Sequence, residues 1–262
     1  MTPRFTVTGL APGSLRIEKR GSEEALAREA AALALAAGAP WAPAVLARRP
    51  GLLVSSRMPG APRPLAALGS DEARALGAVL RAVHETGRAG GGGLWWWTDP
   101  ATSLAGYRAA RVRDAEGALA GTGHAGLAAR AAAAAPPPDP EGDPEPFRLL
   151  HGDLAEANIV WDGASPALVD WEFSRMGDPA EDLAYLVEVN GVPPALVAAL
   201  LRGYGPPAMA GRVDAWRGLV AADAGAWYLG QGMEAEAAPL LARAADLAGP
   251  TSGRPRPRGR GR

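Results

Sequence analysis

The sequence predicts an α+β fold of two lobes, a small β-rich lobe at the N-terminus followed by a larger helical lobe. Short strand-like segments separated by turns fill the first part of the chain. The stretch Met58-Pro59-Gly60-Ala61-Pro62 is rich in turn residues and marks the predicted boundary between the lobes. Alanine-rich helical segments then follow, near 70–86, 103–118 and 124–135. The predicted units are 1–58, 59–249 and a disordered Arg-rich tail, 250–262.

Composition narrows the function classes. A chain of 262 residues that is 48% hydrophobic can bury a substantial core. Its formal net charge of −1 provides no overall attraction to nucleic acid or to a membrane. There are no cysteines, no signal-like N-terminus and no apolar run near the ~20 residues of a membrane-spanning helix, so we expect a cytoplasmic protein.

The first predicted strands, 4–10 and 14–20, carry the first candidate functional residue. Strand side chains alternate between faces, which places Leu15, Ile17 and Lys19 on one face of the second strand. Lys19 is the single lysine among 27 basic residues. Because an ammonium and a guanidinium are not interchangeable at a phosphate site, the lone lysine hints at such a site. Chance survival of one lysine is the alternative.

A helix and a second pair of strands complete the predicted N-terminal lobe. Ser22 is a suitable N-cap for a helix over 23–37, and Glu29 borders the apolar stripe of that helix. Two further strands are expected at 44–48 and 52–57.

The segment from His151 to Asp170 carries the most specific motif. His151-Gly152-Asp153 is followed by four residues and then Asn158, and this spacing matches the catalytic loop of protein kinases, H-x-D-x-x-x-x-N. Asp153 can orient or deprotonate an attacking group, and Asn158 can reach a Mg²⁺ ion. Short strands are predicted around 158–161 and 167–170, and the second ends in Asp170, which places a second carboxylate at the same cleft.

Two motifs together resemble one family. The pair HGD-x4-N and VDWE, with GDPAEDLA after it, is similar to the aminoglycoside-phosphotransferase and choline-kinase-like family. The resemblance is strongest over 148–188 and weaker over 14–60. It implies a two-lobed, protein-kinase-like fold that holds ATP or GTP between the lobes.

The resemblance also implies roles for single residues. Asp153 would be the catalytic aspartate, and Asn158 and Asp170 would bind Mg²⁺. Lys19 would hold the α- and β-phosphates, and Glu29 would pair with Lys19 to aim it.

The end of the fourth predicted strand resembles the hinge of the family. There the backbone of Ser55, Ser56, Arg57 and Met58 would read the adenine edge. Arg16 competes with Lys19 for the phosphate role, but strand alternation directs it to the other face.

The start of the next helix constrains the acceptor. Asp178-Pro179 begins a helix eight residues after Asp170, which leaves no room for a peptide-docking segment, so we expect a small-molecule acceptor. Asp178 and Glu181 have the spacing of a capping box. The resemblance implies that Asp182 supports the catalytic loop by hydrogen bonds.

Charge around the motif suggests an acceptor class. Segment 151–190 has nine acidic residues and one basic residue, Arg175. This excess favours a cationic acceptor such as an aminoglycoside. The alternative is that metal binding and helix capping already account for about half of the acids.

Two other functions remain open. Only 18 residues precede Lys19, with Gly9 and Gly13 as the only glycines for a phosphate-cradling loop, so a pseudokinase-like binding protein is the main alternative. An RNA-associated protein that uses the Arg-rich tail is the weaker one. A P-loop enzyme is excluded because no GxxxxGK[ST] motif occurs. The sequence does not predict an oligomeric state.

Overall fold

The computed structural model describes residues 5–8, 14–86, 94, 103–136 and 147–250. The candidate loop glycines Gly9 and Gly13 lie outside the described residues. The Arg-rich tail lies outside them as well, apart from its first residue.

The N-terminal part is a four-stranded antiparallel sheet covered by one helix. Its strands run in the order β1-β2-β4-β3, which confirms the predicted strands. The elements are β1 (Phe5–Thr8), β2 (Arg16–Gly21), α1 (Glu23–Leu35), β3 (Val45–Arg49) and β4 (Leu52–Ser56).

Helix α1 begins where its cap predicts. The Ser22 hydroxyl accepts a hydrogen bond from the Ala25 N–H at 3.3 Å. The buried face of α1 includes Glu29, which therefore points into the protein rather than along the border of the stripe. The helix ends at Leu35, two residues before its predicted end at residue 37.

Short strands connect the sheet to the helical part. Strands β5 (Ala61–Pro62), β7 (Ile159–Asp162) and β8 (Ser165–Leu168) form one small antiparallel sheet, and β6 (Arg148–Leu150) pairs with β9 (Arg175–Gly177) in another. Strands β7 and β8 were predicted, whereas β5, β6 and β9 were not. A strand of two or three residues is too short to show alternating polar and apolar side chains. In addition, every residue of β6 and β9 is buried, so neither strand has a polar face.

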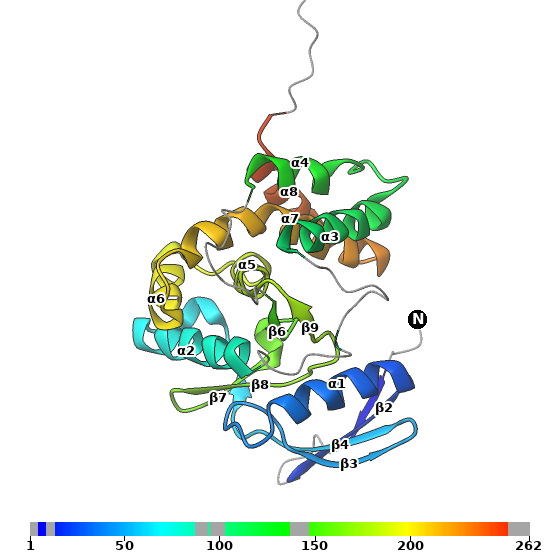
Figure 1. Ribbon diagram of the computed structural model, residues 1–262, viewed down its shortest axis with the longest axis vertical. Coiled ribbons are helices and arrows are strands. Elements are labelled where there is room, and N and C mark those ends of the chain that lie inside the picture. Colours follow the sequence, from blue (N-terminus) through cyan, green and yellow to red (C-terminus); the bar gives the residue numbers. More distant parts are fainter. Residues whose placement is uncertain (1–4, 9–13, 87–93, 95–102, 137–146, 251–262) are drawn as a thin grey trace, which may run out of the picture.

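Seven helices dominate the rest of the described chain. They are α2 (Ser70–Thr86), α3 (Leu104–Leu119), α4 (Leu127–Ala134), α5 (Pro179–Val189), α6 (Pro194–Tyr204), α7 (Met209–Gly230) and α8 (Glu234–Ala248). The β2-β4-β3 sheet with α1 lies at one end of the molecule, and α3, α4, α7 and α8 gather at the other (Figure 1). No helix among the described residues is both long and apolar enough to cross a membrane.

A stack of aromatic rings joins the N-terminal part to the segment that carries the site. The Trp41 ring lies 5.9 Å from the ring of Trp171, which lies 4.7 Å from the His151 ring. The Leu168 N–H also donates to the Trp41 carbonyl oxygen at 2.8 Å. Trp171 and His151 are fully buried, so these contacts fix the sheet of Lys19 against the strand that precedes Asp170.

Candidate active site

Lys19 is buried and lies at the centre of a group of carboxylates, of which the side chains of Glu29 and Glu172 are buried and that of Asp170 is exposed. Its Nζ is 2.9 Å from Glu29 Oε2 and 2.8 Å from Glu172 Oε2, and it also contacts Asp170 Oδ1. These side chains come from β2, from α1 and from the segment after β8. The structure therefore brings together three of the predicted residues, Lys19, Glu29 and Asp170, and adds Glu172. We call these four residues the lysine cluster.

The electrostatics of the lysine cluster keep Lys19 charged. Burial alone would lower the pKa of Lys19, but the carboxylates of Glu29 and Asp170 more than offset this, and the pKa is raised. Burial raises the pKa of Glu29, against the opposing effect of Lys19. Three carboxylates around a single ammonium leave an excess of negative charge, which suits an added cation.

The donor atoms of the lysine cluster fit a magnesium ion. Oxygen atoms of Glu29, Asp170 and Glu172 all lie within 4.8 Å of one another. Mg²⁺ is a hard cation that binds carboxylate and amide oxygens and retains several waters, so one or two protein carboxylates suffice. Glu172 is the glutamate of the VDWE motif, and the sequence analysis assigned it no function of its own.

Asp170 has an unusual backbone. Among the described residues it is the only non-glycine residue with a positive φ, at 66°. Left-handed backbone is unfavourable for a residue with a side chain, and it concentrates at functional sites. The chain leaves β8 at Leu168, and the conformation of Asp170 directs the following segment so that Glu172 also reaches Lys19.

Asp153 is held by hydrogen bonds to both of its carboxylate oxygens. The Asn158 amide donates to Oδ2 at 2.9 Å, and the Tyr185 hydroxyl donates to Oδ1 at 2.8 Å. Burial and the charge of Asp153 raise the pKa of Tyr185, so Tyr185 remains a donor. Asn158 uses its N–H groups toward Asp153, which leaves its amide oxygen as the atom suited to a metal. Tyr185 was not predicted.

Asp182 supports the catalytic loop by hydrogen bonds, as predicted. The Asp182 carboxylate accepts the backbone N–H groups of His151 at 2.7 Å and Gly152 at 2.9 Å. His151 Nε2 lies 3.0 Å from the Val169 carbonyl oxygen, and its Nδ1 lies 3.4 Å from the Asp153 N–H. Burial lowers the pKa of His151, and a neutral ring with the proton on Nε2 satisfies both contacts. His151 therefore shapes the loop.

Gly152 allows the loop to turn. Its φ is +83°, and a Cβ atom added there would lie 2.2 Å from the Phe173 carbonyl oxygen. Both the left-handed backbone and the close approach require glycine.

The catalytic loop and the segment of Asp170 are joined by a backbone hydrogen bond and by contacts of the His151 ring. The Val169 N–H donates to the Asn158 carbonyl oxygen at 3.0 Å, which ties the catalytic loop to the residue before Asp170. The His151 ring lies between the Asp153 N–H and the Val169 carbonyl oxygen, so Asp153 and the residue before Asp170 flank the same side chain. That Asp153, Asn158 and Asp170 act together stays a prediction.

The predicted hinge residues lie at the end of β4, and part of their backbone is used within the sheet. The Ser56 N–H donates to the Ala44 carbonyl oxygen at 2.8 Å, and the Arg57 N–H donates to the Leu15 carbonyl oxygen at 3.0 Å. Ser55 pairs with β2. The backbone N–H groups of Ser56 and Arg57 are therefore used within the sheet, and the reading of an adenine edge by this stretch stays a prediction.

The capping-box prediction is half wrong. Asp178 caps α5, because its carboxylate accepts the N–H of the second helical residue at 2.9 Å. The Glu181 carboxylate does not return to the cap. It accepts hydrogen bonds from Tyr107 at 2.5 Å, Arg111 at 2.8 Å and Arg175 at 2.6 Å. We call these four residues the arginine cluster: Glu181, Tyr107, Arg111 and Arg175.

Much of the acidic excess near the motif is neutralised by basic residues distant in sequence. Asp178 pairs with Arg212 at 2.5 Å, and Glu188 pairs with Arg243 at 2.9 Å and contacts Arg217. These partners lie in α7 and α8, where a local charge count cannot detect them. The charge excess of segment 151–190 is therefore weak support for a cationic acceptor.

Comparison with known proteins agrees with this geometry. The family model described as "phosphotransferase enzyme family" matches residues 4–219. No curated protein sequence matches significantly. The fold and the site define a phosphotransferase of the protein-kinase-like class. The chain belongs to the phosphotransferase enzyme family, and it is a small-molecule kinase.

Solved structures share the fold at low sequence identity. A choline/ethanolamine kinase family protein from Mesorhizobium loti is 24% identical, with a TM-score of 0.67 over 94% of this chain and 88% of that chain. A macrolide 2'-phosphotransferase from Brachybacterium faecium is 22% identical, with a TM-score of 0.63 over 90% and 91%. A choline kinase from Streptococcus pneumoniae is 15% identical, with a TM-score of 0.69 over 95% and 90%.

Proposed function

We propose that this protein transfers the γ-phosphate of ATP or GTP, with Mg²⁺, to a hydroxyl or amine group of a cationic small molecule such as an aminoglycoside. The observation that carries the proposal is the burial of the only lysine among three carboxylates, one from α1 and two from the segment after β8. A purely structural ion pair needs one carboxylate, whereas a site for a metal-bound polyphosphate needs both the ammonium and the additional acids.

The nucleotide side uses the lysine cluster. Lys19 would bind the α- and β-phosphates while Glu29, 2.9 Å away, holds its ammonium in place. Asp170, Glu172 and the Asn158 amide oxygen would hold Mg²⁺, which neutralises charge on the phosphates. The excess negative charge of the cluster fits this role, because a divalent cation would balance it.

The acceptor side uses Asp153. Its carboxylate would orient the acceptor hydroxyl and take its proton as the oxygen bonds to the γ-phosphorus and the bond from phosphorus to the β-phosphate oxygen breaks. Tyr185 and Asn158 each donate to one oxygen of Asp153, which restricts the orientation of the carboxylate. Positioning of this kind supplies most of the catalysis in phosphoryl transfer.

Aromatic side chains near Asp153 support a cationic acceptor. The rings of Trp227 and Tyr228 meet edge to face with centroids 5.1 Å apart, and Trp227 is 49% exposed. Burial and the charge of Asp153 raise the pKa of Tyr228, so the charge of this carboxylate reaches Tyr228. Exposed aromatic rings attract cations.

A coupled nucleotide-turnover assay tests the proposal. Aminoglycosides, choline-like amines, sugars, amino-acid alcohols and macrolides would be screened with Mg-ATP and Mg-GTP. We expect turnover with at least one cationic hydroxyl compound, and Asp153→Asn should abolish it while nucleotide binding stays nearly intact.

Thermal shift measurements separate the pseudokinase alternative. Stabilisation by Mg-nucleotide without turnover of any acceptor would favour a binding protein. Absence of stabilisation by both nucleotides would contradict a nucleotide site of either kind.

A further inference from the structure

A cavity lies in the helical part, and it is not lined by any residue of the lysine cluster. It has a volume of about 290 Å³ and is formed by α2, β6, the start of α5 and the connection between α6 and α7. None of the residues assigned above to nucleotide, metal or acceptor lines it. Its volume is close to the lower limit of small-molecule sites, roughly 300 Å³.

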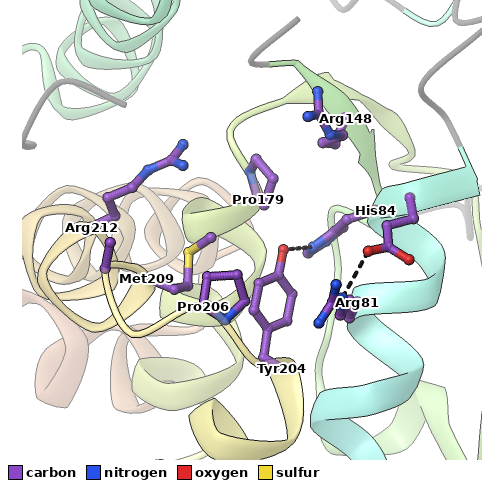
Figure 2. Close-up of a pocket in the computed structure, with 10 residues that line it drawn as sticks. Arg81, His84, Arg148, Pro179, Tyr204, Pro206, Met209 and Arg212 are labelled. Atoms are coloured by element: carbon purple, nitrogen blue, oxygen red, sulfur yellow. Dashed lines mark hydrogen bonds and ion pairs between the residues drawn. The ribbon is translucent and has the colours of Figure 1, made fainter. Parts of the chain in front are cut away.

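The lining of this cavity is strongly basic. Arg81, Arg148 and Arg212 all face it, together with a single carboxylate, Glu85 (Figure 2). Glu85 pairs with Arg81 at 2.7 Å and is more than half exposed. Against these three guanidinium groups stand Glu85 and the Asp178 carboxylate that pairs with Arg212, which leaves a positive excess. A positive excess favours an anionic ligand, because planar guanidinium groups match phosphate and carboxylate oxygens.

Two of these arginines are held in place by burial or by an ion pair. Arg148 is only 6% exposed, and Arg212 places its Nη2 2.5 Å from the Asp178 cap of α5. Arg212 Nε is buried and has no hydrogen-bond partner among the described residues. A buried unpaired donor costs free energy, so its presence at a cavity wall indicates a group that a ligand satisfies.

The remaining walls add shape. Tyr204 and His84 lie between the arginines, and Met209 and Pro206 supply apolar contacts (Figure 2). Burial raises the pKa of Tyr204; the charges of Arg212 and Arg148 oppose this rise, and those of Asp178 and Asp182 add to it. The hydroxyl therefore remains protonated.

The geometry points to a second ligand site in this cavity that binds a small phosphate-bearing anion. Arg148 and Arg212 bind its oxygens from the buried side, Arg81 binds from the open side, and Tyr204 lies between them. The anion is distinct from the nucleotide, because the cavity is bounded by other elements than those that carry Lys19 and Asp170.

The cavity is connected to the catalytic loop through one histidine. His84 Nδ1 lies 2.9 Å from the Tyr204 hydroxyl, and its Nε2 lies 3.3 Å from Asp182 Oδ2. The same Asp182 oxygen accepts the N–H of His151 at 2.7 Å. A bound anion that moves Tyr204 or His84 therefore acts on the residue that anchors the loop of Asp153.

Inorganic phosphate is the probe for a binding test by calorimetry, without nucleotide or Mg²⁺ and at constant ionic strength. We expect saturable binding that weakens about tenfold in Arg81→Gln and in Arg148→Gln, since each loses a charge-assisted hydrogen bond. Arg202→Gln, an exposed arginine on α6 outside the cavity, is the matched control and should bind like the wild type. Circular dichroism checks each fold, and Arg81→Gln carries the test if Arg148→Gln does not fold.

Histidine NMR locates the bound phosphate, because the chain contains three histidines. Titration should shift the ring signals of His84 and, through Asp182, of His151, while exposed His124 stays unchanged. No saturable binding, equal weakening in Arg202→Gln, or binding that leaves His84 unmoved would each overturn the site. A His84 shift without a His151 shift would overturn the connection to the loop. Binding of citrate but not of phosphate would show that the ligand class is wrong.

Discussion

The lysine cluster and the arginine cluster are both largely buried groups of charges, yet their charge balance differs. In the lysine cluster one ammonium meets three carboxylates, Glu29, Asp170 and Glu172. In the arginine cluster one carboxylate, Glu181, accepts hydrogen bonds from two guanidinium groups and a phenol.

This difference in charge balance distinguishes a candidate ligand site, the lysine cluster, from a structural group of ion pairs, the arginine cluster. Glu181 has a donor on each of its oxygens, and burial, which would raise its pKa, is outweighed by Arg175 and Arg111, so the pKa is lowered. Arg111 also pairs with Asp223 at 2.6 Å, which balances the second cation. The arginine cluster is therefore complete within the protein, whereas the lysine cluster has acids in excess and fits a further cation. Burial of charge alone does not identify a functional site; an imbalance of charge does.

The largest expected effect comes from breaking the lysine cluster at its metal side. Asp170→Ala should reduce turnover roughly 10³-fold, because charge stabilisation of the phosphates is lost. It should also weaken binding of Mg-nucleotide and reduce its dependence on Mg²⁺. Turnover across a magnesium titration, with nucleotide binding measured in parallel, checks this. Wild-type magnesium dependence in the variant would show that Asp170 is no ligand.

The arginine cluster should respond in stability rather than in chemistry. Glu181→Gln leaves two buried guanidinium groups undercompensated, and we expect a loss of roughly 3 kcal/mol in the free energy of unfolding. Turnover per folded molecule should stay near the wild-type value. Urea denaturation measures the first quantity. The control is Glu24→Gln, which removes an exposed pair with Arg28 and should cost less than about 1 kcal/mol.

The two clusters also show what the sequence could and could not predict. Strand alternation and the lone lysine pointed to Lys19, and motif spacing pointed to Asp170, because these are local properties; the role of Glu29 came from the family resemblance. Glu181 has the local spacing of a capping box, but Arg111 and Arg175, brought close by folding, bind it instead. Such tertiary competition leaves no trace in a window of a few residues.

The residues that were missed depend on contacts between elements. Tyr185 reaches Asp153 only because α5 packs beneath the catalytic loop. Glu172 reaches Lys19 only because Asp170 adopts a positive φ. The strands of the first sheet were predicted because they are four to six residues long, whereas β6 and β9, with three residues each, show no period.

A smaller effect is expected at the acceptor side. Tyr185→Phe removes one of the two donors that orient Asp153 without removing the ring. We expect turnover to fall about tenfold, the effect of one hydrogen bond to a charged group, with little change in Mg-nucleotide binding. The control is Tyr107→Phe in the arginine cluster, which also removes a phenol hydroxyl that donates to a carboxylate and should keep near-normal turnover per folded molecule. Equal losses in both variants would contradict a specific role for Tyr185.

The smallest effect should appear in the pH dependence of stability. The pKa of His151 in the folded protein is lowered by burial below the ordinary value of 6.5. Between these two values the unfolded chain binds more protons than the folded one, so stability is full above about pH 6.5 and decreases as the pH falls toward the folded pKa. The slope from this one group is at most about 1.4 kcal/mol per pH unit.

Urea denaturation at several pH values from about 7.5 to 5.5 measures this slope. His151→Gln should flatten it, because the substitution removes the titrating ring. His124→Gln, at an exposed position, should retain the wild-type slope. The lowered pKa values of Glu181 and Asp182 affect stability only below the ordinary carboxyl values of 4.5 and 3.8, outside this window. An unchanged slope in His151→Gln would mean that the ring is not held neutral between Val169 and Asp153, and the orientation of the catalytic loop would then need another support.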